Sequence, residues 1–330
     1  MAINSSSKLS EVINAAPAAE APKVAPKVEA AAAPKPAEES HEHADIKMST
    51  ASKSRKNMRY LQNMKKKGEK IVQMCPAELG PLFAMAAEKV GCDICRIPSM
   101  MSLRAANRLD DELLCGTLTI QKFREYVKII HINFYMPTAT YATKDQAVRW
   151  GAEWTFDGAD SMLPMGISNE VLKHMTDNYV PVYGHIGAIS GWQTNAYGYK
   201  RVGKTAEDAF RIFKWGYEYQ ENGMGGMTIE LTPMEVSQKI SEKLRVPVVS
   251  IAGGAPCDGS EMVDMDTFGV MPKPASHSKT YAQLMPFLCD AYAGWADDVR
   301  EGKYPEEKHG YHMDPAELEK FTEMMDKFEA

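Results

Sequence analysis

From about residue 57 the chain alternates short apolar runs with amphipathic stretches, and this alternation limits the folds that it can adopt. The apolar runs lie at 70–74, 92–98, 132–137, 160–165, 180–186, 227–232 and 246–253, with 262–270 as a candidate eighth. Almost continuous apolar strands separated by helices are typical of parallel strands that are buried on both faces. Seven or eight such units favour an α/β fold of the closed (β/α)8 TIM-barrel type over an open sheet.

The two ends of the chain fall outside this repeat. Residues 1–56 are rich in Ala, Pro, Lys and Glu and contain no Phe, Trp or Tyr, which predicts a disordered tail. A targeting segment is disfavoured because the first arginine is Arg55 and glutamates are frequent. Helical patterns at 279–299 and 314–330 predict a C-terminal extension of the barrel domain, 57–330, which is available to pack on the barrel or on another subunit.

Composition excludes several classes of function. A formal net charge of -6 argues against a basic face for nucleic acid. The chain has no apolar run of about 18 residues, so no membrane span is expected. Six cysteines at irregular spacing, without a secretory signal before them, predict reduced thiols and a cytoplasmic protein.

In a (β/α)8 barrel the reactive groups project from the carboxyl ends of the strands. Glu230, in "MTIELTP", lies at such an end and precedes a proline that starts a helix. Partial desolvation there would suit a carboxylate to general-base catalysis. The competing interpretation is a glutamate that caps a helix or pairs with a nearby Lys or Arg.

A long polar and aromatic segment, 184–204, follows the strand predicted at 180–186. Loops of this length usually have a function, such as holding a ligand. It contains His185 between glycines, which permit close approach of the backbone to a ligand or to a neighbouring strand. Lys200 can clamp an anionic group, although a solvated lysine is the commoner case, and His185 can equally be a structural histidine.

These segments resemble a known family. "VPVYGHIGAISGWQTNAYGYKRVGK" looks like the Gly-His-Leu-Gly … Gly-Gly-Tyr-Lys-Val-Gln-Gly-Arg segment of ketopantoate hydroxymethyltransferases. "MTIELTPMEV" and the following "VPVVSIAGGAPCDG" are similar to that family's Leu-Glu-Cys-Val-Pro and Ile-Pro-Val-Ile-Gly-Ile-Gly-Ala-Gly segments. The resemblance extends from about 66 to 312.

The resemblance implies a barrel of the phosphoenolpyruvate/pyruvate superfamily that acts in pantothenate biosynthesis. Such an enzyme transfers a one-carbon unit from 5,10-methylenetetrahydrofolate to the 2-oxoacid 3-methyl-2-oxobutanoate, with Mg²⁺ on the enolate and a glutamate as base. Glu230 matches that glutamate, and His185 matches the Gly-His-Leu-Gly histidine. The family is commonly a homo-oligomer, in the form of a decamer.

The sequence departs from the family where the resemblance places metal and substrate ligands. The family's Gly-Asp-Ser reads "IPS" here, so that Ser99 is retained but Pro98 replaces the aspartate. Tyr135 replaces a second aspartate, and "SMLPMG" (161–166) lacks the family's Lys-x-Glu. Proline, tyrosine and methionine do not supply the oxygen ligands that Mg²⁺ prefers, so use of Mg²⁺ and the identity of any metal ligand stay open.

Substitute ligands and alternative functions follow from these departures. Candidate oxygen ligands near predicted strand ends or loops are Asp110, Asp111, Asp157 and Asp160. Ser99, His185, Tyr135 and Lys200 are the candidate substrate-binding residues, with Glu230 as the catalytic base. The alternatives are another reaction of the superfamily, such as carbon–carbon lysis or hydrolysis of a 2-oxoacid-like substrate, and a non-catalytic binding or assembly subunit.

Overall fold

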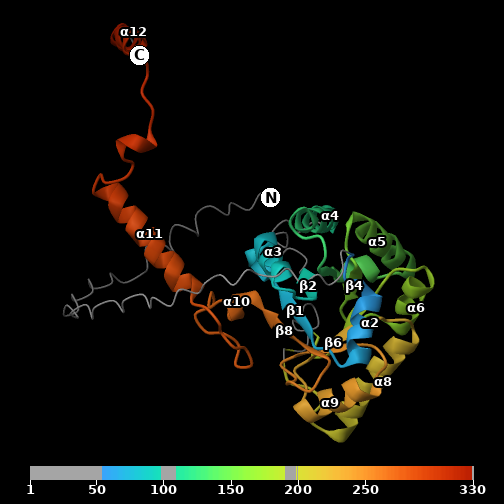
Figure 1. Cartoon of the computed structure of the whole chain (residues 1–330). Helices are drawn as coiled ribbons and strands as arrows, with labels where there is room; N and C mark the ends of the chain where they lie inside the picture. Colours follow the sequence, from blue (N-terminus) through green and yellow to red (C-terminus); the bar gives the residue numbers. More distant parts are fainter. Residues whose placement is uncertain (1–53, 98–108, 190–197, 199, 329–330) are drawn as a thin grey trace, which may run out of the picture. The chain divides into compact units, whose positions relative to one another are not determined.

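Eight parallel strands form one sheet in the computed structural model, which describes residues 54–97, 109–189, 198 and 200–328 (Figure 1). The strands are β1 (Ile71–Cys75), β2 (Ile94–Ile97), β3 (His131–Met136), β4 (Ser161–Pro164), β5 (Tyr183–Gly187), β6 (Gly226–Glu230), β7 (Val248–Ile251) and β8 (Gly259–Val263). Their order is β4-β3-β2-β1-β8-β7-β6-β5, and a bridge between Met162 and Val182 joins the two edge strands. This nearly closed barrel confirms the predicted (β/α)8 fold.

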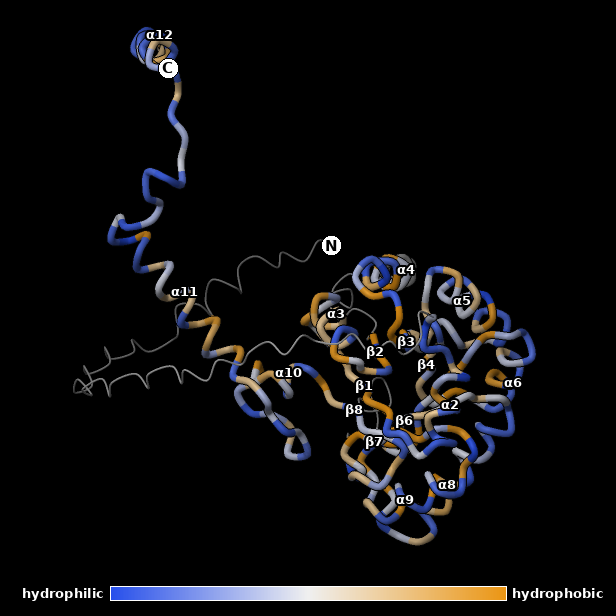
Figure 2. Tube along the Cα trace, viewed as in Figure 1, coloured by the Kyte–Doolittle hydropathy of each residue, from blue (hydrophilic) through white to orange (hydrophobic). Residues whose placement is uncertain are grey.

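Helices follow the first six strands and surround the sheet (Figure 1). They are α3 (Pro81–Lys89), α4 (Leu109–Tyr126), α5 (Lys144–Asp157), α6 (Asn169–Asp177), α8 (Ala206–Glu221) and α9 (Met234–Lys243), with short 3-10 helices η1 (Ala77–Leu79) and η3 (Thr138–Tyr141). Side chains of Thr143, Ser168 and Thr205 cap α5, α6 and α8 by accepting backbone N–H groups. The strands between the helices are mainly hydrophobic (Figure 2), which agrees with burial on both faces.

The eighth strand begins earlier than its apolar pattern indicates. It spans Gly259–Val263, whereas 262–270 was expected, and Asp264–Thr267 forms the short helix α10. Glu261 is charged but points into the barrel. An apolar pattern alone therefore detects only Met262 and Val263, at the end of this strand. Gly259 permits the close pairing of β8 with β1, because a Cβ atom there would collide with the carbonyl group of Ile71.

The amino end of the barrel is closed by α2 (Met58–Lys67). Its buried side chains join residues from four strands in a second core cluster: Leu61, Met64, Ile71, Ile94, Tyr183 and Val249. Lys56, which the sequence analysis includes in the tail, is buried, and its Nζ donates to Asp93 Oδ1 at 2.7 Å. The ordered barrel therefore begins by Lys56. The rest of the predicted tail, residues 1–53, lies outside the described residues.

The C-terminal extension contains the predicted helices as α11 (Leu284–Arg300) and α12 (Pro315–Asp326), with the 3-10 helix η4 (Glu307–His309) between them. Neither α11 nor α12 has a buried residue. Large side chains such as Tyr292, Trp295 and Phe321 are at least half exposed. Among the described helices, none has the length and apolar character needed to cross a membrane.

Candidate active site

His185 and Glu230 meet near the carboxyl ends of the neighbouring strands β5 and β6. His185 Nε2 lies 2.8 Å from Glu230 Oε2, and both side chains are buried. Glu230 is the last residue of β6 and stands opposite Gly187 in the strand register. Glu230 therefore lies at a strand end, as expected, with His185 as a partner of its carboxylate.

The backbone around this pair is unusually constrained. Gly187 has φ 86°, and a Cβ atom there would collide with the carbonyl oxygen of Glu230. Ala188 N donates to the same oxygen at 2.9 Å. Leu231 has φ 51°, a value that non-glycine residues rarely adopt and that tends to occur at functional sites. Gly187 thus serves close approach to the neighbouring strand, one of the two roles expected for the glycines around His185, whereas a Cβ atom on Gly184 would meet the side chain of Met224.

The contacts of His185 indicate its tautomer. Nε2 lies within hydrogen-bond distance of two acceptors, Glu230 Oε2 and the Ala188 carbonyl oxygen at 3.0 Å. An acceptor cannot bond to an unprotonated nitrogen, so Nε2 carries a proton. Nδ1 is buried and has no hydrogen-bond partner among the described residues. His185 therefore donates to the carboxylate of Glu230 and orients it.

A hydrogen-bonded network fills the barrel on the amino side of this pair. Gln73 Nε2 donates to Glu261 Oε2 at 2.6 Å and to Thr228 Oγ1 at 3.2 Å. Tyr183 donates its hydroxyl to Gln73 Oε1 at 3.0 Å. These residues come from β1, β8, β6 and β5, and they form a rigid polar floor beneath Glu230.

Arg96 of β2 completes the network through an ion pair with Glu261. Burial lowers the pKa of Arg96, but the neighbouring Glu261, Cys75 and Glu230 outweigh this effect and raise it. The sequence analysis missed both Arg96 and Glu261. Each is a charged residue within a strand that is otherwise apolar or small, and such residues are seldom buried unless they are paired. That signal was present in "CDICRIP" and "DGSEMV".

The described residues of the barrel mouth do not fit a divalent cation. Within the described part of the chain, no group of three or more His, Cys, Asp or Glu side chains could hold a metal ion. The interior carboxylate of Glu261 already faces a guanidinium. Mg²⁺ needs several oxygen ligands arranged around it, and the two interior carboxylates are committed to His185 and Arg96 instead.

The other predicted substrate residues have different outcomes. Tyr135 is half-buried on β3. Its neighbours Phe134 and Met136 pack in the core between the strands and the helices. Because successive side chains of a strand point to opposite faces, Tyr135 points towards the barrel interior. Lys200 is exposed. Its segment returns to the site at Val202, whose N–H donates to the carbonyl oxygen of Leu231 at 3.1 Å. Ser99 and Pro98 lie outside the described residues.

The substitute metal ligands are not supported as a set. Asp160 precedes β4 and therefore lies at the amino end of the barrel, away from the reactive mouth. Its carboxylate is already bound by the Arg124 guanidinium and by Ile132 N. Asp157 ends α5 at the same side. The suggestion that these two aspartates bind a metal was wrong, because they precede a strand. The side chains of Asp110 and Asp111 are not among those described.

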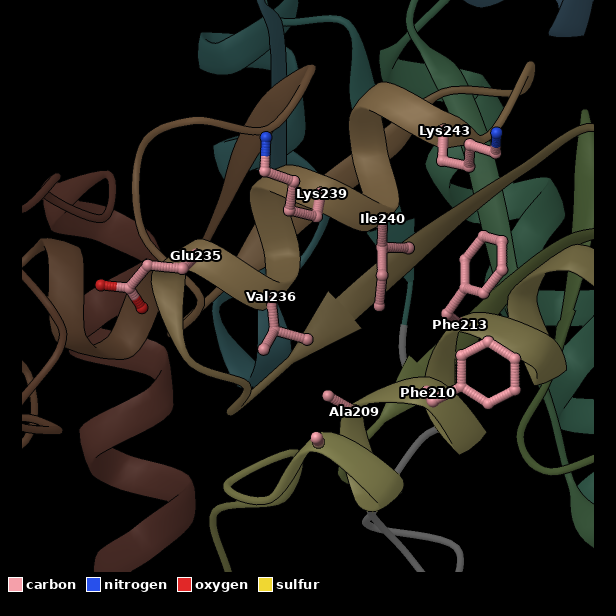
Figure 3. Close-up of a pocket in the computed structure, with 9 residues that line it drawn as sticks. Ala209, Phe210, Phe213, Glu235, Val236, Lys239, Ile240 and Lys243 are labelled. Carbon is pink, nitrogen blue, oxygen red and sulfur yellow. The ribbon is translucent and has the colours of Figure 1, made fainter.

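A separate groove lies in the outer helical layer between α8 and α9, with a volume of about 580 Å³ (Figure 3). Its wall is mostly apolar and includes Phe210, Phe213, Val236 and Ile240. Lys239 and Lys243 extend from its α9 side (Figure 3). The groove contains none of the strand-end residues described above, so the candidate chemistry belongs to the barrel mouth.

Comparison with known proteins gives a consistent family. The family model described as ketopantoate hydroxymethyltransferase matches residues 55–307. 3-Methyl-2-oxobutanoate hydroxymethyltransferase 1 of Methylibium petroleiphilum is 26% identical over 291 residues, covering 86% of this chain and 98% of the relative. The enzyme of Nitrosopumilus maritimus named 3-methyl-2-oxobutanoate hydroxymethyltransferase is 26% identical over 280 residues, or 82% of this chain and 99% of the relative.

Among solved structures, 2,3-dimethylmalate lyase, a member of the PEP mutase/isocitrate lyase superfamily, aligns with a TM-score of 0.49 and 10% sequence identity. The alignment covers 82% of this chain and 96% of that chain.

Proposed function

Because the chain belongs to the ketopantoate hydroxymethyltransferase family, we propose that it transfers a hydroxymethyl group to a 2-oxoacid through an enolate, with Glu230 as the base. The observation that carries this proposal is the contact between His185 and Glu230 at the carboxyl ends of β5 and β6. A buried carboxylate oriented by a hydrogen-bond donor is suited to remove a proton from carbon.

The proposed substrate is 3-methyl-2-oxobutanoate, the molecule named in the relatives. Glu230 removes the proton at C3, and the electron pair of that C–H bond forms the enolate. Water cleaves the two C–N bonds of the one-carbon unit of 5,10-methylenetetrahydrofolate, which releases tetrahydrofolate and formaldehyde. C3 of the enolate then bonds to the formaldehyde carbon, and the formaldehyde oxygen takes up the proton held by Glu230 and becomes the hydroxyl group of the product. His185 keeps the carboxylate of Glu230 in place. Ser99, Tyr135 and Lys200 are the proposed contacts to the substrate.

The proposal includes assembly as a cytoplasmic homo-oligomer, with the predicted decamer as one form. Support comes from α11, a 17-residue helix without a buried residue. Several large side chains on it are exposed, including Phe287, Tyr292 and Trp295. Isolated helices of about this length are marginally stable in water unless an apolar face is covered, and a second copy of the chain is the proposed cover.

The test is exchange of the C3 proton of 3-methyl-2-oxobutanoate in D₂O, followed by NMR. Native protein and Glu230→Gln are compared, each with Mg²⁺ and with a chelator. We expect exchange in the native protein and a loss of about 10²-fold or more in Glu230→Gln, because the general base is removed. Glu235→Gln, an exposed position on α9, is the matched control.

Absence of exchange in folded native protein under every condition would reject the enolate mechanism. Exchange that survives Glu230→Gln would instead reject Glu230 as the base. The assay needs no folate, so it separates the first chemical step from the transfer of the one-carbon unit.

A further inference from the structure

The strands of the barrel contribute one side chain with a permanent positive charge. Among the residues of the eight strands, Arg96 is the one lysine or arginine. Its side chain is 14% exposed, while that of Glu261 is fully buried. A charge of this kind costs free energy to bury and is seldom retained in a strand without a partner or a function.

The ion pair with Glu261 leaves donors of Arg96 unused. The contact to Glu261 is made by Nη2. Nε is buried and has no hydrogen-bond partner among the described residues. A guanidinium carries five N–H donors in a planar fork that matches the two oxygens of a carboxylate. Glu261 thus anchors the side chain through Nη2, while Nε is a buried donor whose hydrogen bond a bound carboxylate would satisfy.

The strand register places Arg96 at the level of Glu230. Gln73 stands opposite Ile94, so Arg96 lies two residues further towards the carboxyl end. Gln73 contacts Thr228, and Glu230 lies two residues beyond Thr228 in the same direction. Residues two apart along a strand point to the same face. The guanidinium and the proposed base therefore both point into the mouth of the barrel.

We propose that the Arg96 guanidinium binds the carboxylate and the C2 oxygen of the 2-oxoacid, and that it meets the enolate charge in place of a divalent cation. This inference rests on the proposed function. As Glu230 takes the C3 proton, the electron pair of the C–H bond forms the C2–C3 double bond, and the π pair of the C2 carbonyl group moves to its oxygen, where the guanidinium of Arg96 meets the negative charge. The described residues offer this cation and no cluster that could hold a metal ion.

Glu261 can offset the negative charge of a bound carboxylate by taking up a proton. A ligand carboxylate adds a negative charge to an interior that already contains Glu261 and Glu230. Burial raises the pKa of Glu261, and this effect outweighs the opposing effects of Arg96 and His185. Protonation of Glu261 on ligand binding would therefore release the guanidinium to the incoming carboxylate while preserving the hydrogen bonds to Gln73 and Thr228.

The experiment is calorimetric titration of the full chain with 3-methyl-2-oxobutanoate in chelator, repeated with Mg²⁺, and with the uncharged methyl ester as a second probe. The test variant is Arg96→Met with Glu261→Gln, which removes the cation without leaving an unpaired buried carboxylate. We expect the native protein to bind the acid equally well with and without Mg²⁺. In the double variant we expect affinity for the acid to fall about tenfold or more, with no comparable loss for the ester.

Two comparisons separate ligand binding from stability. Glu261→Gln alone frees the guanidinium and is expected to maintain or increase affinity for the acid. Arg124→Met with Asp160→Asn removes a matched buried ion pair at the amino end of the barrel. This double substitution is expected to lower the melting temperature without lowering the affinity for the acid. If the Arg96 pair were purely structural, its removal would likewise change only the melting temperature, which would overturn the proposal.

Other outcomes are equally decisive. Binding of the acid that requires Mg²⁺, or no binding at all, would overturn the role of Arg96. Exchange of the C3 proton that is unaffected by the Arg96 variant would overturn it while leaving the proposed function intact. Arg96-dependent binding of the acid without any proton exchange would reject the enolate mechanism but support the carboxylate site.

Discussion

Glu230 Oε2 lies 2.8 Å from Nε2 of His185. The two residues are separated by 45 positions in the sequence and meet because β5 and β6 pair in parallel, with Gly187 opposite Glu230. The contact joins a buried hydrogen-bond donor to a carboxylate at the end of a strand.

Replacement of His185 by Phe should retain the volume of the ring but remove the donor to Glu230. We expect C3 proton exchange to fall about tenfold or more, because the carboxylate is no longer held in one orientation. His174→Phe on α6 is the control, and an unchanged exchange rate in His185→Phe would contradict the positioning role.

Gly187→Ala should disturb the site through the backbone. The added Cβ atom meets the carbonyl oxygen of Glu230, and φ at this position is 86°. We expect a loss of about 2 kcal/mol or more in the free energy of unfolding, together with reduced proton exchange. Gly68→Ala is the matched control, because φ there is 71° and nothing lies within 4 Å of the added atom. Its cost should be about 1 kcal/mol, without an effect on exchange. Equal effects of the two substitutions would show that strain alone is responsible.

Asp264, at the start of α10, should make stability depend on pH. Burial raises its pKa from 3.8 to about 7, and its Oδ2 has no hydrogen-bond partner among the described residues. The folded state therefore binds this proton more tightly than the unfolded state does. Its contribution to stability is fully present below the unfolded value of 3.8 and is lost as the pH rises through about 7.

Asp264→Asn should remove that dependence. Relative to native protein, we expect a gain of about 1–3 kcal/mol in the free energy of unfolding at pH 8, and little or none at pH 4. Urea denaturation at several pH values measures both. Asp290→Asn, exposed on α11, should have no such effect. A gain that is equal at both pH values would show that protonation of Asp264 is not its cause.

Tyr292→Glu combined with Trp295→Glu tests the proposed assembly. Both side chains are exposed within the chain, at 66% and 55%, so the substitutions remove no intrachain core contact. We expect native protein to be an oligomer by light scattering after gel filtration. The double variant should shift to smaller species, while its far-UV circular dichroism spectrum stays the same as that of the native protein. A monomeric native protein, or an oligomer unaffected by the substitutions, would contradict a role for α11 in assembly.

Much of the fold follows from local sequence patterns. Seven of the predicted apolar runs contain the observed strands β1 to β7 or coincide with most of their length. The pattern was informative because strands buried on both faces remain apolar throughout. It was misleading at β8, where Glu261 points inward and the apolar run starts only at Met262. Gly259, not an apolar residue, begins that strand.

The sequence by itself determined the repeating units, the family and the position of Glu230 at a strand end. These features could be predicted because a strand and its end are recognised from the pattern of consecutive residues. Only the tertiary structure decided which charges meet. Arg96 and Glu261 come from β2 and β8, which are both neighbours of β1, and they pair only because the sheet curves into a barrel. His185 and Glu230 depend in the same way on the register of β5 with β6. Two charged groups pair when they are close in space, and the number of residues between them in the sequence does not give that distance.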